Sequence, residues 1–307
     1  MLKQHSCTDA DVTWSNALII KDNRAIISGF LNGKPGASVP LETPDNDDII
    51  QGTCDQKHCF LITKKGKCWQ YNIESLVWKE INYLPLTNSN ENSIIKVALG
   101  VTVNAALTNK GEVWNFGNQL SSAEMKVVDI DCGKEHGILL TDSGYVYTWG
   151  SGSRGQLGNG TLDNYEDICE VHLLAGLNIS KISAGGWHNA VLSKDGDIYT
   201  WGWNKKGQLG HPMLDGTNKN GVAVLAEPRV VDWPNSLNIF VKEISCGTSH
   251  TVALLENGEL WGCGWNKWGQ LGTTAFESTH VMFKLEISPL IIVRKIKCAA
   301  WNTIIIC

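Results

Sequence analysis

The sequence predicts an all-β protein, a seven-bladed β-propeller in which residues 1–307 form one domain. Three observations lead to this prediction. A pattern of glycine, histidine and aromatic residues recurs with constant internal spacing, and weaker copies of it bring the number of units to seven. Each unit consists of short strand patterns joined by tight turns, and no stretch has the periodicity of a long amphipathic helix.

The three best copies of the pattern lie in residues 130–272, the well-formed part of the repeat. Their histidines lie 52 and 62 residues apart, and their turn glycines and GQLG tetrapeptides are offset by the same intervals. A common offset for every feature is what duplication produces. The features are His136, His188 and His250, followed by Gly144, Gly196 and Gly258.

Each well-formed unit predicts a hairpin followed by a loop. After the histidine comes an apolar strand such as 190–193, and then a D-G or N-G turn, which suits a hairpin because primed turns need positive φ. A second strand rich in aromatic and β-branched residues, such as 197–202, ends in the GQLG loop. A more polar connection then leads to the next unit.

Degenerate copies extend the repeat over residues 1–117, and a closing half-repeat occupies residues 296–307. Units of about 44 residues with four strands are typical of propeller blades. The position of the repeated histidine is occupied in chain order by Ser15, His58, Val103, His136, His188, His250 and Asn302. Seven such positions predict seven blades.

Two blades are predicted to be irregular. The third is short, because only 33 residues separate Val103 from His136, and an outer strand is expected to be missing or irregular there. The closing blade is incomplete, because the chain stops within its half-repeat. Either residues 1–12 pair with that blade without an aromatic-glycine signature, or the ring-closing strand is absent and Met1 marks a truncation; we favour the second interpretation.

Composition narrows the class of protein. A formal charge of −5 and a pI of about 5.9 argue against a broad nucleic-acid footprint. No secretory signal pattern is present, so the ten cysteines are expected to be reduced thiols in a protein that is not secreted. The longest aliphatic stretches, such as 289–293, are too short to span a bilayer, and no membrane partner is expected.

The G-x-x-H, aromatic-glycine and GQLG elements resemble the repeats of the regulator of chromosome condensation (RCC) family, whose members form seven-bladed propellers. The segments AGGWH, GDIYTWGWN and the terminal WNT most resemble the small single-domain members of that family. Those members partner a JmjC-domain 2-oxoglutarate oxygenase linked to histone demethylation and chromosome segregation. The resemblance therefore implies a non-enzymatic scaffold of the nucleus, chromosomes and cytoplasm, with histones or chromatin as indirect partners.

Two other functions follow from the same resemblance. The founder of the family implies guanine-nucleotide exchange on a Ran-type small GTPase, with acidic and main-chain groups pressed into the nucleotide site. A substrate adaptor for a ubiquitin ligase is the third alternative. No enzyme activity, cofactor or metal is predicted for the chain itself.

The repeat explains the residues that suggest chemistry. The cysteines that precede the histidine position by four residues share that place with Ala184 and Leu99, as a small packing position does. The histidines occur once per blade, so we expect structural hydrogen bonds to nearby backbone rather than catalysis. The G-x-G-x-x-G match at 150–155 is followed by no helix pattern, so we interpret it as a blade loop in which Gly152 is accidental.

Tryptophans provide the candidate protein-binding residues. Trp14, Trp187 and Trp301 precede the histidine position and are expected on one rim of the ring, with inter-blade packing as the alternative role. Trp203, Trp265 and Trp268 lie in the GQLG loops and could instead stack on nucleic acid or methylated lysine. The polar connection 211–228 is a further candidate for docking.

Overall fold

A computed structural model of the chain describes residues 9–13, 15–31, 34–81, 92–115, 118–122, 124–211, 223–234, 239–287 and 292–307. These residues form an all-β structure of 26 strands, with one short 3₁₀ helix at His172–Leu174 and no α-helix. The prediction of an all-β propeller is confirmed.

The first three sheets come from the degenerate part of the repeat, and each has four antiparallel strands within the described residues. The first contains β1 (Asp9–Val12), β2 (Asn16–Lys21), β3 (Arg24–Leu31) and β4 (Lys34–Leu41). The second contains β5 (Ile49–Cys54), β6 (His58–Thr63), β7 (Cys68–Asn72) and β8 (Trp78–Glu80). The third contains β9 (Ile94–Leu99), β10 (Asn104–Thr108), β11 (Val113–Asn115) and β12 (Asn118–Gln119).

The next three sheets come from the well-formed repeats and also have four strands each. The fourth contains β13 (Val127–Cys132), β14 (His136–Thr141), β15 (Val146–Gly150) and β16 (Tyr165–Glu170). The fifth contains β17 (Ile179–Ala184), β18 (His188–Ser193), β19 (Ile198–Trp203) and β20 (Val224–Val230). The sixth contains β21 (Val241–Cys246), β22 (His250–Leu255), β23 (Leu260–Trp265) and β24 (Ser278–Lys284).

The seventh sheet has two strands in the described residues, β25 (Lys295–Ala299) and β26 (Asn302–Ile306). Within the described residues the closing sheet is therefore incomplete, as predicted. Residues 9–12 pair with β2 and not with β26, so they belong to the first sheet. The short third sheet is also as predicted, because its fourth strand, β12, has only two residues.

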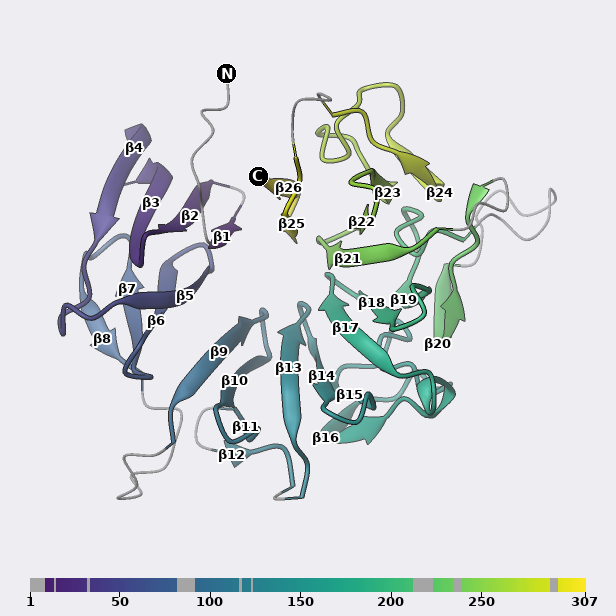
Figure 1. Cartoon of the computed structure of the whole chain (residues 1–307), viewed down its shortest axis with the longest axis horizontal. Helices are drawn as coiled ribbons and strands as arrows, with labels where there is room; N and C mark the ends of the chain where they lie inside the picture. The colour runs from purple at the N-terminus through teal and green to yellow at the C-terminus, as the bar shows by residue number, and fades with distance from the viewer. Residues whose placement is uncertain are drawn as a thin grey trace.

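The sheets follow one another in chain order around a common centre (Figure 1). The first strand of each sheet lies innermost and contacts the first strands of its neighbours, and β25 contacts β1. The ring is therefore closed by contact between the first and last sheets (Figure 1).

The hydrophobic core lies between neighbouring sheets and follows the ring. Ile138 and Leu140 of β14, for example, pack in one cluster with Val191 and Trp201 of the fifth sheet. All six residues of β14, β18 and β22 are buried, because each of these strands is flanked by two others and covered on both faces. The apolar second strands read from the sequence are thus the buried centre of the fourth, fifth and sixth sheets.

The register of the first sheet moves its histidine position by one residue. Val12 pairs with Ala17 as Cys132 pairs with Gly137, so the equivalent of His136 is Asn16. The assignment of this position to Ser15 was wrong. The shift is not evident in the sequence, because Thr13 stands where the well-formed units have the glycine of G-x-x-H.

Candidate functional site

The repeated histidines join neighbouring sheets. The Nε2 atom of His136 lies 2.9 Å from Asn189 Oδ1, and that of His188 lies 2.9 Å from Thr251 Oγ1. In each case the partner is the second residue of the next sheet's second strand. His250 makes the same contact with Thr303 Oγ1 at 3.1 Å. The bonds are structural, as expected, but they reach side chains of the next sheet rather than nearby backbone.

The GQLG loop supplies the other half of this junction. The Gln156 carbonyl accepts a bond from Asn189 Nδ2 at 2.7 Å, and the Gln208 carbonyl accepts one from the Thr251 hydroxyl at 2.7 Å. Because these partners donate to the loop, their oxygens accept the Nε2 proton of the histidine. We call the histidine, the partner side chain and the glutamine carbonyl the clip, and it explains why G-x-x-H and GQLG occur together.

A glycine three residues before the histidine makes room for its ring. A Cβ added to Gly185 would lie 2.1 Å from His188 Cε1, and Gly133 and Gly247 face their histidines in the same way. The rings are therefore enclosed as well as bonded. Burial lowers the pKa of His136 and His250 to about 4 and that of His188 to about 3, so all three are neutral at pH 7.

The clip is absent from the second and third sheets of the described structure. His58 is partly exposed and bonds within its own sheet, to Asp55 Oδ2 at 3.2 Å and Asn72 Nδ2 at 3.3 Å. Val103 occupies the histidine position of the third sheet and has no polar side-chain atom. The degenerate sequence of these units therefore corresponds to a simpler junction.

The cysteines that precede the histidine position are packing residues. Cys132, Cys246 and Cys298 are buried, and each lies on a different sheet. Burial raises the pKa of Cys246 and Cys298 to about 12, so these thiols are protonated at neutral pH. In the described residues no three histidine, cysteine or acidic side chains gather as metal ligands.

The G-x-G-x-x-G match is a loop between two strands. Gly150 ends β15, and the chain continues through 151–164 to β16 without a helix, so a dinucleotide site is not formed. Gly152 is nevertheless required by the local fold, because a Cβ there would lie 1.8 Å from the Asp163 carbonyl oxygen. Gly152 is thus not part of the repeat, as predicted, but the loop between β15 and β16 requires a glycine there, which was not predicted.

Five of the six predicted tryptophans lie at one face of the ring, either in loops or, for Trp203 and Trp265, at the strand end that leads into a loop. These loops either join the first and second strands or follow the third, and antiparallel pairing brings both kinds to the same edge of each sheet. We call this the tryptophan face; its members are Trp187, Trp203, Trp265, Trp268 and Trp301. Trp14 lies outside the described residues, as do residues 212–222 of the predicted docking connection.

Trp187 is half-buried between the fourth and fifth sheets. The Lys134 ammonium lies 4.4 Å from its ring centroid and the Arg154 guanidinium 4.5 Å away. Its Nε1 donates to Glu135 Oε2 at 3.1 Å, and its ring meets Trp203 edge to face with centroids 5.3 Å apart. Trp187 therefore contributes to inter-sheet packing as well as to the surface.

The second tryptophan pair lies between the sixth and seventh sheets. Trp265 and Trp301 meet edge to face with centroids 5.9 Å apart, and Trp301 remains 44% exposed. Trp268, in the loop that follows Trp265, is 65% exposed. Large aromatic side chains with this exposure are typical of protein contact sites.

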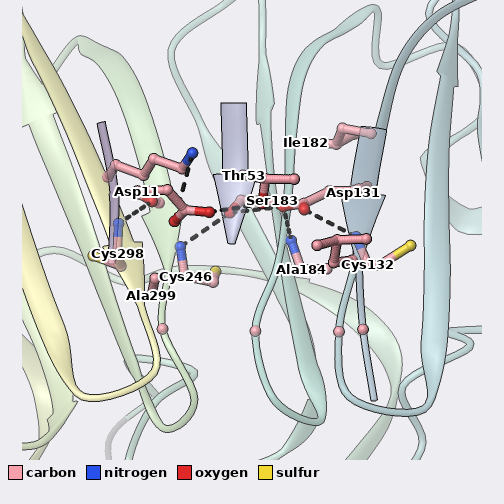
Figure 2. Close-up of a pocket in the computed structure, with 18 of the residues that line it drawn as sticks. Asp11, Thr53, Asp131, Cys132, Ile182, Ser183, Ala184, Cys246, Cys298 and Ala299 are labelled. Atoms are coloured by element: carbon pink, nitrogen blue, oxygen red, sulfur yellow. Dashed lines mark hydrogen bonds and ion pairs between the residues drawn. The ribbon is translucent and has the colours of Figure 1, made fainter. Parts of the chain in front are cut away.

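A cavity of about 800 Å³ lies at the centre of the ring, lined by the innermost strands (Figure 2). Polar side chains bridge neighbouring strands there: Asp131 Oδ2 accepts the Ala184 N–H at 2.8 Å, and Ser183 Oγ accepts the Cys246 N–H at 3.0 Å (Figure 2). Burial raises the pKa of Asp131. Sequence reasoning missed this lining, although its signal was present as polar residues at every second position of the first strands.

Ion pairs also line the cavity. Lys96 pairs with Asp129 at 2.6 Å, and Lys297 pairs with Asp11 at 3.6 Å. Lys295 pairs with Asp9 at 3.0 Å. Because these charges compensate one another across sheet junctions, the cavity wall serves to hold the ring together.

Comparison with known proteins places the repeat in a family. The regulator of chromosome condensation (RCC1) repeat model matches residues 143–192, 195–254 and 257–306. A second model of the same description matches residues 127–156, 179–208 and 241–270. Together the matches cover more than half of the chain, including the tryptophan face.

Curated relatives share about a third of the aligned residues. RCC1 domain-containing protein 1 of Mus musculus is 35% identical over 210 residues, which cover 59% of this chain and 55% of the mouse protein. The ultraviolet-B receptor UVR8 of Arabidopsis thaliana is 32% identical over 162 residues, covering 53% of this chain and 34% of the receptor. The match thus spans about half the length of the first relative and a third of the second.

Solved structures share the fold. Human WBSCR16 superposes with a TM-score of 0.80 at 20% identity, covering 98% of this chain and 86% of that structure. Prp20p from Saccharomyces cerevisiae, described together with its binding properties to Gsp1p and histones, gives a TM-score of 0.77 at 17% identity and covers 95% and 80%. In the described residues of the present chain, no helix is long and apolar enough for a membrane crossing.

Proposed function

Because the chain belongs to the family of regulator of chromosome condensation (RCC1) repeat proteins, we propose that it is a non-enzymatic scaffold whose tryptophan face binds another protein. One observation carries the proposal: Trp268 and Trp301 are exposed where the repeat itself does not require an aromatic residue. The clips and the buried core explain the other repeated residues, but they leave these two rings uncovered.

The partner that we propose is a JmjC-domain 2-oxoglutarate oxygenase acting on chromatin. This step rests on the similarity to RCC1 domain-containing protein 1 and on the resemblance of the GWN and WNT segments. It would place the chain in the nucleus and on chromosomes as well as in the cytoplasm, with contact to histones through the partner.

The test is capture by the immobilised chain from a nuclear extract, read by mass spectrometry. We expect a JmjC-domain oxygenase among the captured proteins and a severalfold loss with the double variant Trp268→Ala/Trp301→Ala at an unchanged melting temperature. Phe240→Ala is the matched control, because Phe240 is 63% exposed and lies against the Gly196 turn at the opposite face. Equal capture by the tryptophan variant and the parent chain would refute the proposal.

Trp187 is less suitable for that test. Its alanine variant would lose two cation contacts, the bond to Glu135 and the packing on Trp203. We therefore expect Trp187→Ala to lower stability as well as binding.

A second function has its own support in the likeness to Prp20p, whose structure was described with its binding to Gsp1p. Guanine-nucleotide exchange on a Ran-type GTPase needs no bound cofactor in the scaffold. A nucleotide-release assay decides between the two proposals: release of labelled GDP at the background rate supports the scaffold, and strong acceleration by the chain would favour exchange.

A further inference from the structure

The loops of the tryptophan face differ in charge from the turns at the opposite face of the same sheets. In the described residues of sheets four to six, the loops of the tryptophan face carry five cations and three carboxylates: Lys134, Arg154, Lys205, Lys206 and Lys267, with Glu135, Asp163 and Glu277. The hairpin turns at the other face carry five carboxylates and one cation: Asp142, Asp195, Asp197, Glu256 and Glu259, with Lys194. In these three sheets the loops of the tryptophan face therefore carry a net positive charge and the hairpin turns of the opposite face a net negative charge, although the whole chain has a net charge of −5.

Tryptophan rings hold several of these cations in place. Lys134 and Arg154 lie over Trp187, Lys206 lies 5.7 Å from the Trp265 centroid, and Lys267 lies 5.8 Å from the Trp268 centroid. A cation stacked on an indole loses less conformational freedom when a carboxylate binds it. Glu135 pairs with Arg154 at 3.4 Å, whereas the four lysines of these loops form no ion pair with a carboxylate of the described residues.

We propose that the tryptophan face binds an acidic, extended segment of its protein partner, with carboxylates on the lysines and apolar side chains on Trp268 and Trp301. The inference rests on the proposed function and names the chemistry of the partner. Complementary charge speeds association and selects the partner, while aromatic contacts supply the affinity.

The geometry favours a protein segment over nucleic acid. Binding of single strands depends on open aromatic faces on which bases stack. Trp187 has cations over its ring, and the pairs Trp187–Trp203 and Trp265–Trp301 meet edge to face, so one indole of each pair covers the other. Stacking along a strand would require these packed rings to separate.

The experiment measures binding of a short fluorescein-labelled peptide in which aspartate and glutamate alternate with leucine and phenylalanine. A peptide with asparagine and glutamine in the acidic positions is the neutral control, and a labelled oligothymidine is the nucleic-acid control. Fluorescence anisotropy at low and physiological ionic strength gives the affinities of the full chain. We expect the acidic peptide to bind most tightly and to weaken as salt increases.

The chain offers a matched pair of variants. Lys205→Glu/Lys206→Glu reverses two neighbouring lysines of the tryptophan face, and Lys64→Glu/Lys65→Glu reverses two at the opposite face with the same change in net charge. Lys64 and Lys65 are 72% and 67% exposed, Lys205 is exposed and Lys206 is partly exposed, and circular dichroism of each variant checks that it is folded. We expect about fivefold or greater weakening for the first and less than about twofold for the second.

The outcomes separate this inference from the proposed function. Equal effects of the two variants, equal affinity for the neutral peptide, or tighter binding of oligothymidine would each overturn the acidic-segment proposal. If Trp268→Ala/Trp301→Ala still lowers capture of the oxygenase in those cases, the scaffold function is retained and only the acidic-segment proposal is rejected. If that variant captures the oxygenase normally while the peptide binds as expected, the acidic-segment proposal holds and the scaffold assignment fails.

Discussion

At the scale of single residues, His188 connects two motifs that look independent in the sequence. Its Nε2 atom reaches Thr251, which in turn donates to the carbonyl of Gln208, and Gly185 leaves the space that the ring occupies. The neutral tautomer with a proton on Nε2 is therefore the form that the junction needs. Both mutation and protonation should weaken it.

Gly185→Ala should destabilise the protein by roughly 2 kcal/mol or more, because the added Cβ collides with the His188 ring and with the Gly247 carbonyl oxygen. The double variant Gly185→Ala/His188→Ala should cost less than the sum of the single variants, because the clash and the bond share one ring. Urea denaturation of the four proteins measures this coupling. Additive losses would show that the glycine does not act through the histidine.

Acid should unfold the protein through the same histidines. Their pKa values are lowered to about 3 and 4 in the folded state, so the unfolded chain binds protons first as the pH falls below about 6.5. The contribution of the buried histidines to stability should be fully present above that pH and be lost towards pH 4, by roughly 3 kcal/mol for each of them. The midpoint of urea denaturation at several pH values measures this loss of stability. His250→Gln should make the midpoint depend less steeply on pH.

His172→Gln is the control for the acid prediction, because His172 is 83% exposed. It should leave the pH dependence as in the parent chain. An equal change in slope for His172→Gln and His250→Gln would contradict the assignment to buried imidazoles.

Residue-level prediction succeeded where the repeat is strong and failed where it is weak. The histidine position was placed correctly in the well-formed units, but in the first unit it was assigned to Ser15 instead of Asn16, where Thr13 replaces the guiding glycine. The clip could not be foreseen, because its partner lies 53 residues further along the chain for His136 and 63 residues for His188.

At the scale of elements, the junctions of the ring are unequal. The fourth, fifth and sixth sheets each extend a clip to the sheet that follows, whereas Val103 of the third sheet has no polar atom to offer. The third sheet also ends in a two-residue strand. We infer that the third sheet is the less stable region of the described ring.

Amide hydrogen exchange should reveal this inequality. We expect the amides of β10 and β11 to exchange faster than those of β18 and β19, because local opening follows the weaker contacts. Mass spectrometry of the exchanged full-length chain, followed by peptic fragments, measures both regions at once. Slower exchange in β10 than in β18 would contradict the role assigned to the clips.

Element-level prediction depended on side-chain periodicity. The buried second strands and the D-G and N-G turns were evident from the sequence, and so was the shortness of the third unit. The position of residues 9–12 was not, because a four-residue strand carries too little pattern to choose between β2 and β26 as its partner.

At the scale of the whole molecule, the ring depends on the seam between the seventh and first sheets. Lys295 pairs with Asp9, Lys297 pairs with Asp11, and Asn302 Nδ2 donates to the Thr13 carbonyl at 3.0 Å. Asp11 is 7% exposed at its side chain and also accepts the Cys54 N–H at 3.0 Å. The carboxylate therefore joins three sheets and needs a cation beside it.

Lys297→Met should lower the free energy of unfolding by roughly 3 kcal/mol, because it leaves a buried carboxylate without its ion pair. Lys284→Met, which breaks the more exposed pair with Glu259 on an outer strand, should cost less than about 1 kcal/mol. Thermal and urea denaturation of both variants measure the difference. Similar losses would show that the seam contributes no more than an ordinary surface pair.

The clip is asymmetric, because its parts come unequally from two neighbouring sheets. This asymmetry affects how the sequence can evolve. The histidine and the glutamine carbonyl belong to one sheet, whereas the side chain that they hold belongs to the next. A substitution at Asn189 or Thr251 therefore alters the junction with the preceding repeat. A compensating substitution is expected in that preceding repeat rather than next to the first substitution. Successive repeats are thus constrained to evolve as linked pairs, although each is encoded as a separate copy.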